Sequence, residues 1–392
     1  MITGAIRRRL ARAFVVRSLD VTAYSNRALD ECGGFPEGDL FPFVFPAIAL
    51  AARSRTGDVP REHALAASRA MLDSARETVR RTIGEPSTLR AGVRQGVYVG
   101  WLALAHGVYR EASGDGRYDD ERRALCAVLR DELDEAGGGP LDSFPGIRWP
   151  FDTVPPLVAL AVSDRIDGTC DAAWRIERHH AWVLEHAMDD ATGLPSSLVG
   201  DRPPFARSAP RGCDLSLRFG MLRLLAPELA RTWYGRYTRA FWCERGWLAG
   251  FREYPKGSSK GGADPDSGPI VAEVGMAASA FGLAATRTMG DRLRYGRLAM
   301  QLAAWDAVWR LAGLVAGERL RAYRPMGDTM RIDPEYVTGF LFGDACLFLT
   351  LSWPEAESEY ALTGVEVNAE DPSSRARAPG PTRASVAAPM PG

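Results

Sequence analysis

Apolar and polar residues follow each other along most of the chain with the period of an α-helix. Segment 60–84 carries Leu65, Met71, Leu72 and Val79 near i, i+3, i+4 spacing, as expected for a helix with one buried face. Alternation typical of strands is scarce. Apolar segments predict buried helices, and amphipathic segments predict surface helices. The two kinds alternate in pairs, with the apolar segment first: 91–113 and 118–136, 155–168 and 171–188, 211–225 and 226–246, and 269–289 and 291–315. A last helix is predicted at 334–351.

About eleven or twelve helices that alternate in this way have a simple packing solution. The apolar helices form an inner ring and the amphipathic helices an outer ring, which makes an all-α fold, an α/α toroid of helical hairpins. Gly- and Pro-rich loops at 137–150, 189–211 and 247–269 are long enough to be functional and should meet over a central cavity. We expect a basic N-terminal helix or arm at 1–30, the barrel at 31–367 and a disordered tail at 368–392.

Composition narrows the class of protein. The 392 residues are 46% hydrophobic and 25% charged with a net charge of −1, which excludes a largely disordered chain and argues against general nucleic-acid binding. None of the six cysteines forms a C-x-x-C pair, so structural zinc is not expected, and we predict no cofactor. Residues 1–20 are basic, but the apolar stretch 13–16 is too short for a signal sequence, which predicts a cytoplasmic protein. This segment is either a plain surface helix or a short amphipathic helix that touches anionic lipid.

Two candidate catalytic carboxylates lie directly before or at the start of apolar helices. Asp152 follows Trp149 and Phe151, whose rings could line a pocket. Asp214 follows Arg211 and Cys213. For both aspartates the alternative is a helix N-cap, and Asp214 could also pair with Arg211.

A third candidate segment is the glycine-rich loop before the apolar segment 269–289. It holds both lysines of the chain, Lys256 and Lys260, and the close pair Asp264 and Asp266. Two neighbouring carboxylates raise the pKa of one of them, which suits a general acid near neutral pH. The alternatives are a flexible loop and an Asx turn that caps the next helix at Asp266 or Ser267. The histidine pair 179–180 sits on an amphipathic outer helix, where we expect exposure to solvent.

Four stretches, 100–118, 162–169, 225–242 and 266–291, resemble linalool dehydratase-isomerase in order and spacing over roughly residues 95–291. The resemblance implies an α/α barrel, a ring-shaped homo-oligomer and cofactor-free dehydration of a terpene alcohol. Asp152 stands where that family keeps a catalytic cysteine, Trp101 where it has a histidine, and Cys213 where it has a tyrosine. The resemblance therefore places carboxylates where the family uses a thiol and an imidazole.

The first functional hypothesis is a cofactor-independent lyase or isomerase of a small lipophilic, isoprenoid-like substrate. Asp152 or Asp266 would be the general acid, and the other carboxylate or Asp214 the later proton acceptor. Trp101, Trp149, Phe151 and Cys213 would line the substrate pocket, and Asp264, Lys256 and Lys260 would border it. The alternatives are a carbohydrate-active enzyme (glycoside hydrolase, lyase or epimerase) on the same toroid, and a non-catalytic relic.

Overall fold

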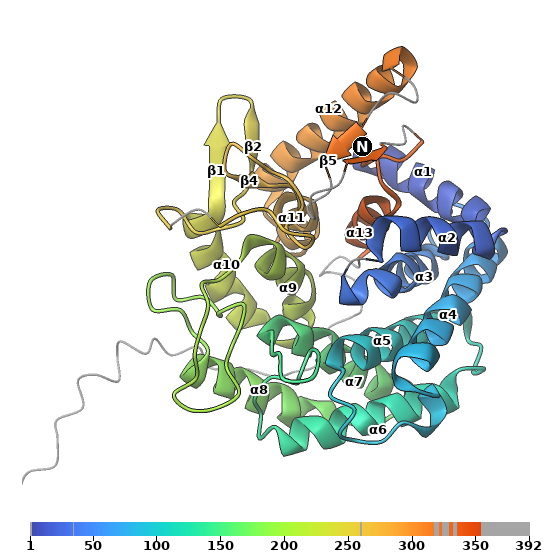
Figure 1. The fold of residues 1–392 in the computed structure, drawn as a ribbon. Helices are drawn as coiled ribbons and strands as arrows, with labels where there is room; N and C mark the ends of the chain where they lie inside the picture. The colour runs from blue at the N-terminus through green and yellow to red at the C-terminus, as the bar shows by residue number, and fades with distance from the viewer. Residues whose placement is uncertain are drawn as a thin grey trace, which may run out of the picture.

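The computed structural model describes residues 2–33, 35–258, 261–316, 321–323, 329–331 and 335–353. In it the chain forms two concentric layers of helices, so the predicted all-α toroid is confirmed (Figure 1). The helices are α1 Ile2–Arg17, α2 Val21–Cys32, α3 Phe41–Arg53, α4 Arg61–Ile83, α5 Gly96–Ser113, α6 Asp119–Glu135, α7 Val154–Asp167, α8 Ala172–His186, α9 Gly212–Leu225, α10 Pro227–Phe241, α11 Met276–Thr288, α12 Arg292–Ala316 and α13 Leu341–Ser352. The shorter elements are the 3₁₀ helices η1 Pro36–Asp39, η2 Pro86–Thr88 and η3 Pro150–Thr153, and the strands β1 Trp242–Arg245, β2 Leu248–Phe251, β3 Ile270–Val271, β4 Val274–Gly275, β5 Arg321–Tyr323 and β6 Thr329–Arg331.

Among the described helices, α3, α5, α7, α9, α11 and α13 make the inner ring. Each packs against the next, and α13 packs back against α3, which closes the ring. The outer helices cover the joints: α4 lies against α3 and α5, α6 against α5 and α7, α8 against α7, α10 against α9, and α12 against α11. The inner helices are more uniformly buried than the outer ones, which matches the two classes of hydrophobic pattern in the sequence.

Helix α3 is an inner helix that the hydrophobic pattern did not single out, because its sequence, FPFVFPAIALAAR, contains prolines at 42 and 46. Pro46 has no N–H to give to the carbonyl of Pro42. The hydroxyl of Tyr24 on α2 donates to that carbonyl instead, so the helix continues through Pro46 without an unsatisfied acceptor.

The N-terminal helix α1 turns its apolar face inward. Ile6, Leu10, Ala11 and Phe14 are buried, and α1 packs against α4, α12 and α13. That apolar face is therefore not available to lipid, and the surface-helix interpretation is the better one for α1 itself. The domain boundaries at 30 and 367 stay predictions, and the predicted tail 368–392 lies outside the described residues.

Three two-stranded antiparallel hairpins, β1–β2, β3–β4 and β5–β6, lie in the connections before α11 and α13. The amphipathic pattern predicted for 226–246 ends at Phe241, where the chain turns into β1, with Trp242 opposite Phe251 of β2. These hairpins give the long loop before α11 a defined shape. None of the helices within the described ranges is both long and apolar enough to cross a bilayer.

Candidate active site

The N-terminal ends of the inner helices all lie at one end of the barrel, and four acidic residues gather there. Glu37 lies in η1 before α3, Asp152 in η3 before α7, Asp214 in the first turn of α9, and Asp266 in the loop before α11. Each of Glu37, Asp214 and Asp266 lies close enough to Asp152 to raise its pKa. We call these four residues the acidic cluster.

Asp152 is the residue of the acidic cluster that most strongly favours its neutral form. Burial raises the pKa of Asp152 well above its usual range, a hydrogen bond with Ser143 opposes the shift, and the charges of its acidic neighbours add to it. The N-terminus of α7 has no side-chain cap, so Asp152 does not serve as its N-cap. A raised pKa is what suits a carboxyl to the role of a general acid.

Glu37 and Asp266 interact across the barrel opening. Burial raises the pKa of Glu37 to about 7, and the charge of Asp266 adds to the shift. Burial, followed by the charge of Asp264, raises the pKa of Asp266, although Asp266 is exposed to solvent. Asp266 is therefore the carboxyl of the acidic cluster that solvent reaches most easily.

Asp214 is held by two hydrogen-bond donors. The hydroxyl of Ser197 donates to Oδ2 of Asp214 at 2.7 Å, and the guanidinium of Arg218 lies 3.4 Å from Oδ1. Burial raises the pKa of Asp214, and Arg218 and Ser197 counteract this shift. Arg218 is buried and also lies over the ring of Phe151, with its guanidinium carbon 6.0 Å from the ring centroid. Asp214 thus has what an anionic partner needs, namely a fixed position and a nearby cation.

Arg211 pairs with Glu253 and Asp264 instead of with Asp214. Its Nε donates to Glu253 at 2.8 Å and a terminal nitrogen donates to Asp264 at 2.7 Å. Burial raises the pKa of Glu253 to about 7, with Arg211 opposing the shift. For Asp264, burial would raise the pKa, but the hydrogen bond and charge of Arg211 outweigh it and the pKa is lowered. Arg211 therefore fixes the loop that carries Asp266 to the start of α9.

Cys213 lies behind this arginine and faces Glu253. Its Sγ donates to Oε1 of Glu253 at 3.1 Å, and its backbone N–H donates to Oε2 at 3.2 Å. Burial and the charge of Glu253 raise the pKa of the Cys213 thiol well above its usual range. The thiol therefore stays protonated and is not a nucleophile at neutral pH.

Neither Asp266 nor Ser267 caps the next helix, since α11 begins at Met276, and the loop instead forms a turn from Asp264 to Ser267. The carboxylate of Asp264 accepts the backbone N–H of Ser267 at 2.8 Å, and the hydroxyl of Ser267 accepts the N–H of Asp264. Asp266, in the middle of this turn, makes none of the turn's side-chain hydrogen bonds. Its carboxylate is thus left to face the acidic cluster.

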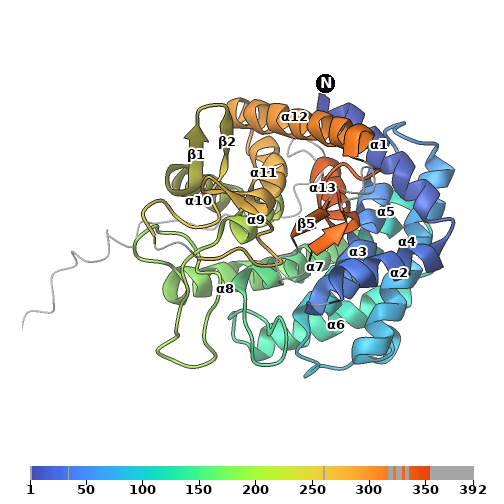
Figure 2. The same cartoon turned by 45° about the horizontal axis from the view of Figure 1, so that its top comes forward.

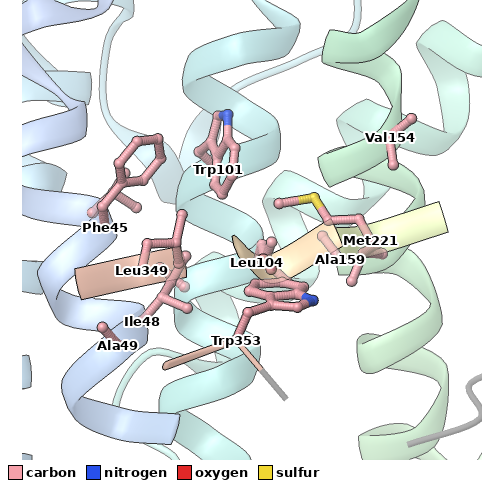
Figure 3. Packing of buried hydrophobic residues seen from close by; sticks show 14 of the residues in the cluster. Phe45, Ile48, Ala49, Trp101, Leu104, Val154, Ala159, Met221, Leu349 and Trp353 are labelled. Atoms are coloured by element: carbon pink, nitrogen blue, oxygen red, sulfur yellow. The ribbon is translucent and has the colours of Figure 1, made fainter. Parts of the chain in front are cut away.

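The aromatic candidates differ in accessibility. Trp149 is partly exposed, precedes η3 and contacts Phe144 edge-on at 6.1 Å. Phe151 is buried and packs in the core. Trp101 is buried between Phe41 and Phe45, with its indole nitrogen turned away from Trp353 and without a hydrogen-bond partner (Figure 3). Trp149 is therefore the aromatic side chain that a ligand could reach, whereas Trp101 serves as packing for the floor of the barrel.

Within the described residues, no lysine side chain contributes to this site. Lys256 is exposed, and its backbone N–H donates to the carbonyl of Ala240 at the end of α10. Lys260 lies outside the described residues. The histidines at 179 and 180 are buried rather than exposed, because the side of α8 that carries them packs inward, where burial lowers the pKa of both.

Sequence reasoning missed several residues of the site. Glu37, Glu253, Ser197 and Arg218 come from segments without a recognisable motif. Glu37 could have been found, because it directly precedes a strongly apolar run, as Asp152 does. Within the described ranges, no group of three or more His, Cys, Asp or Glu residues is arranged to hold a metal ion.

The opposite end of the barrel holds a small hollow. It has a volume of about 50 Å³ and lies between the C-terminal halves of the inner helices, beside Leu104, Val162 and Trp353. Its walls are mainly apolar. An enclosed site for a terpenoid would need several hundred Å³, so this hollow does not provide one.

Comparison with known proteins agrees with the fold. No family model and no curated protein matches the chain. Among solved structures, the GH76A α-1,6-mannanase from Salegentibacter sp. HEL1_6 superposes with a TM-score of 0.56 at 10% identity, over 89% of this chain and 98% of that one. An inactive variant of the same enzyme, with two consecutive aspartates replaced and α-1,6-mannotetraose bound, superposes with a TM-score of 0.54 at 11% identity, over 89% and 99% of the two chains.

These neighbours correct the resemblance to linalool dehydratase-isomerase. The stretches that carried it are mostly helix-packing positions, which any α/α toroid needs, so they reported the fold and not the reaction. The lyase or isomerase assignment and the small lipophilic substrate are wrong, since the neighbours are glycoside hydrolases and one is bound to an oligomannose. The homo-oligomer was implied by the same resemblance and loses its support with it.

The neighbours' aspartates are not carried over to this chain. The sequence has two Asp–Asp pairs, at 119–120 and 189–190. The first begins the outer helix α6, and in the second Asp190 pairs with Arg207 at the surface. Neither pair belongs to the acidic cluster. At 10–11% identity the likeness shows that the chain has the fold of these α/α toroids.

Proposed function

We propose that the protein is a carbohydrate-active enzyme, a glycoside hydrolase that cleaves a glycan at the acidic cluster. The observation that carries the proposal is the convergence of Glu37, Asp152, Asp214 and Asp266, from four separate segments, at one end of the inner helical ring. Glycoside hydrolysis needs a carboxyl that holds a proton and a second carboxylate that is ionised. We assign the first role to Asp152 and the second to Asp214, where Arg218 and Ser197 oppose the rise in pKa that burial causes.

Asp152 is the proposed general acid. Its burial and its acidic neighbours raise the pKa of the carboxyl, and the protonated carboxyl would pass its proton to the glycosidic oxygen as the bond to the sugar breaks. Asp214 is the proposed second carboxylate, held by Ser197 and facing Arg218. It would activate water or stabilise the positive charge that develops on the sugar ring.

Glu37 and Asp266 would border the same site and keep its potential negative. An oxocarbenium-like transition state carries positive charge, so a site lined by carboxylates favours it over the neutral substrate. The half-exposed ring of Trp149, next to η3, would offer a sugar a flat apolar face. We propose α-1,6-linked mannose oligomers as the first substrates to try, because the superposed neighbour binds one.

The test is hydrolysis of α-1,6-mannotetraose, with an α-glucan and a β-mannan oligomer in parallel, followed by chromatography of the products. The wild-type protein should shorten at least one of the three glycans. Asp152→Asn should lower kcat by about 10²–10⁴-fold, because it removes the acid proton while it keeps the shape of the side chain. Asp201→Asn, at an exposed loop position, is the matched control. Cleavage by Asp152→Asn at the wild-type rate would contradict the proposed role.

A further inference from the structure

Five of the exposed apolar residues of helix α12 lie on one outward face, and Trp305 and Leu314, which are 40% and 85% exposed, lie to either side of it. Leu293, Met300, Val308, Leu311 and Val315 are 78%, 54%, 58%, 63% and 82% exposed. Their spacing of 7, 8, 3 and 4 residues keeps them on one side of a 3.6-residue helix. A surface helix normally turns such a face inward, and an exposed apolar patch of this extent marks an interaction site.

The helix is firmly held on its other side, so the exposed stripe does not result from a loosely packed segment. Leu298 is buried, Tyr295 shares a hydrogen bond of 2.9 Å with Thr3 of α1, and the buried Asp306 pairs with Arg9. The turn between β1 and β2 is tied to the same helix, because Gln301 donates to the carbonyl of Trp247. Trp247 is itself 78% exposed, which adds an aromatic side chain beside the stripe.

The same edge of the molecule is strongly basic. Helices α1 and α12 lie side by side there (Figures 1 and 2). Together they contain nine arginines and one aspartate, and Asp58, Asp344, Asp291 and Glu244 of neighbouring segments pair with four of these arginines, which leaves a net charge of +4 in a chain whose total is −1. Arg8, Arg12 and Arg292 are exposed to solvent.

We propose that α12 and α1 form a docking face for an anionic phospholipid surface. The apolar stripe of α12 lies shallowly in the boundary between headgroups and acyl chains, Trp247 lies at headgroup level, and the arginines face the lipid phosphates. The charge decides against a second copy of the chain, since two faces that each carry an excess of arginines would repel each other. The proposal does not depend on the acidic cluster or on the proposed hydrolase activity.

This face differs from the one expected at residues 1–20. Most apolar side chains of α1 are buried in the barrel, and Val16, which is 65% exposed, adds an apolar side chain to its charge. The larger apolar contact comes from α12, nearly 300 residues later in the chain. The fold brings the two parts together. The protein would lie on the membrane surface.

The test is co-sedimentation of the full chain with sucrose-loaded vesicles of phosphatidylcholine, with and without phosphatidylglycerol. The wild-type protein should bind the anionic vesicles and leave them at high salt. V308E/L311E should lower the partition coefficient by about tenfold or more, because it places two charges where the acyl boundary begins. R8Q/R12Q should weaken binding to the anionic vesicles, with a shallower salt dependence. Leu29→Glu, an exposed apolar position on α2, should bind like wild type.

Two outcomes would overturn the proposal, with circular dichroism to confirm that every variant is folded. One is a wild-type protein that does not bind anionic vesicles, or a V308E/L311E variant that binds them equally well. The other is a concentration-dependent dimer, seen by sedimentation velocity without lipid and lost in V308E/L311E. That result would assign the stripe to a second copy of the chain.

Discussion

Residue surroundings divide the acidic residues of the site into two kinds. Asp152 and Glu37 lie among protein atoms and other acids, which favours their protonated forms. Asp264 faces Arg211, which lowers its pKa, and at Asp214 the nearby Arg218 opposes the rise in pKa that burial causes. Burial acts to raise the pKa of all four carboxyls, so the difference between them comes from the arginines that lie beside Asp214 and Asp264.

Ser197 is a positioning residue for Asp214, and its removal tests that role. Ser197→Ala leaves Oδ2 of Asp214 without its donor at 2.7 Å. We expect kcat on a cleaved glycan to fall about tenfold with little change in KM, since a hydrogen bond to a charged group is worth about 1.5–3 kcal/mol. The pKa of Asp214 should rise, which moves the acid limb of the pH–rate profile to higher pH.

The exposed position Ser87 gives the matched control, and Ser87→Ala should leave both kcat and the profile unchanged. A Ser197→Ala variant whose acid limb stays in place would show that Asp214 is not the group that must be ionised.

Glu37 should make stability depend on pH. Its pKa is about 7 in the folded protein against an ordinary value of 4.5, so the folded state holds the proton more tightly than the unfolded state. Stability therefore falls as pH rises from about 4.5 to 7 and then levels off. Glu37→Gln removes the ionisation and should raise the free energy of unfolding by about 1–2 kcal/mol at pH 8 and by almost nothing near pH 4.5.

Urea unfolding at both pH values measures this difference, with Glu177→Gln at an exposed site on α8 as the control. An equal effect of Glu37→Gln at the two pH values would argue against a raised pKa at Glu37.

At the residue scale, the sequence identified acidic residues of the site but not the side chains that pair with them. Asp152, Asp214 and Asp266 were chosen because each lies beside an apolar helix, and the fold brings all three together. Pairing of Arg211 with Asp214 is one alternative that the sequence allows, yet Arg211 pairs with Glu253, 42 residues away. Such a choice depends on tertiary distance, which local sequence does not contain.

Elements pack closely where glycines remove side chains. A Cβ at Gly100 of α5 would lie 2.5 Å from Cγ of Pro156 on α7, and one at Gly107 would lie 2.7 Å from Val162. The two inner helices therefore touch along a line that starts next to η3 and Asp152. This close contact fixes the position of Asp152 relative to α5.

Gly100→Ala should destabilise the fold by about 1–3 kcal/mol, because overpacking a rigid proline ring forces the two helices apart. Gly235→Ala on α10 is the matched change, since its Cβ would meet no atom closer than 3.7 Å. That variant should be neutral or slightly stabilising. Thermal unfolding measures both, and similar melting temperatures for the two variants would refute the close contact.

Most helices could be predicted from the sequence to within a few residues, because the inner and outer patterns differ along the whole chain. The pattern predicted 211–225 where α9 spans Gly212–Leu225, and 118–136 where α6 spans Asp119–Glu135. The hydrophobic pattern did not predict a helix whose continuity depends on a residue of another helix. Helix α3 needs Tyr24 to satisfy the carbonyl that Pro46 leaves free.

At the scale of the whole molecule, acidic, apolar and basic residues gather in three different regions. The N-terminal ends of the inner helices carry acids, the C-terminal ends enclose a small apolar hollow, and the edge formed by α1 and α12 carries arginines. The net charge of −1 does not reveal this division, because it is the sum over the acidic and the basic regions of the molecule. The architecture could be predicted from helical periodicity, whereas the reaction could not, because positions that pack helices are common to toroids with different chemistry.

The central claim is that the acidic cluster is where a glycan binds and reacts. A crystal structure of the Asp152→Asn protein soaked with the glycan that the wild-type protein cleaves tests it most directly. The account predicts a sugar ring against Trp149, with a glycosidic oxygen within hydrogen-bonding distance of residue 152 and Asp214 at the same sugar. An oligosaccharide bound only at the opposite end of the barrel, beside Trp353, would contradict it.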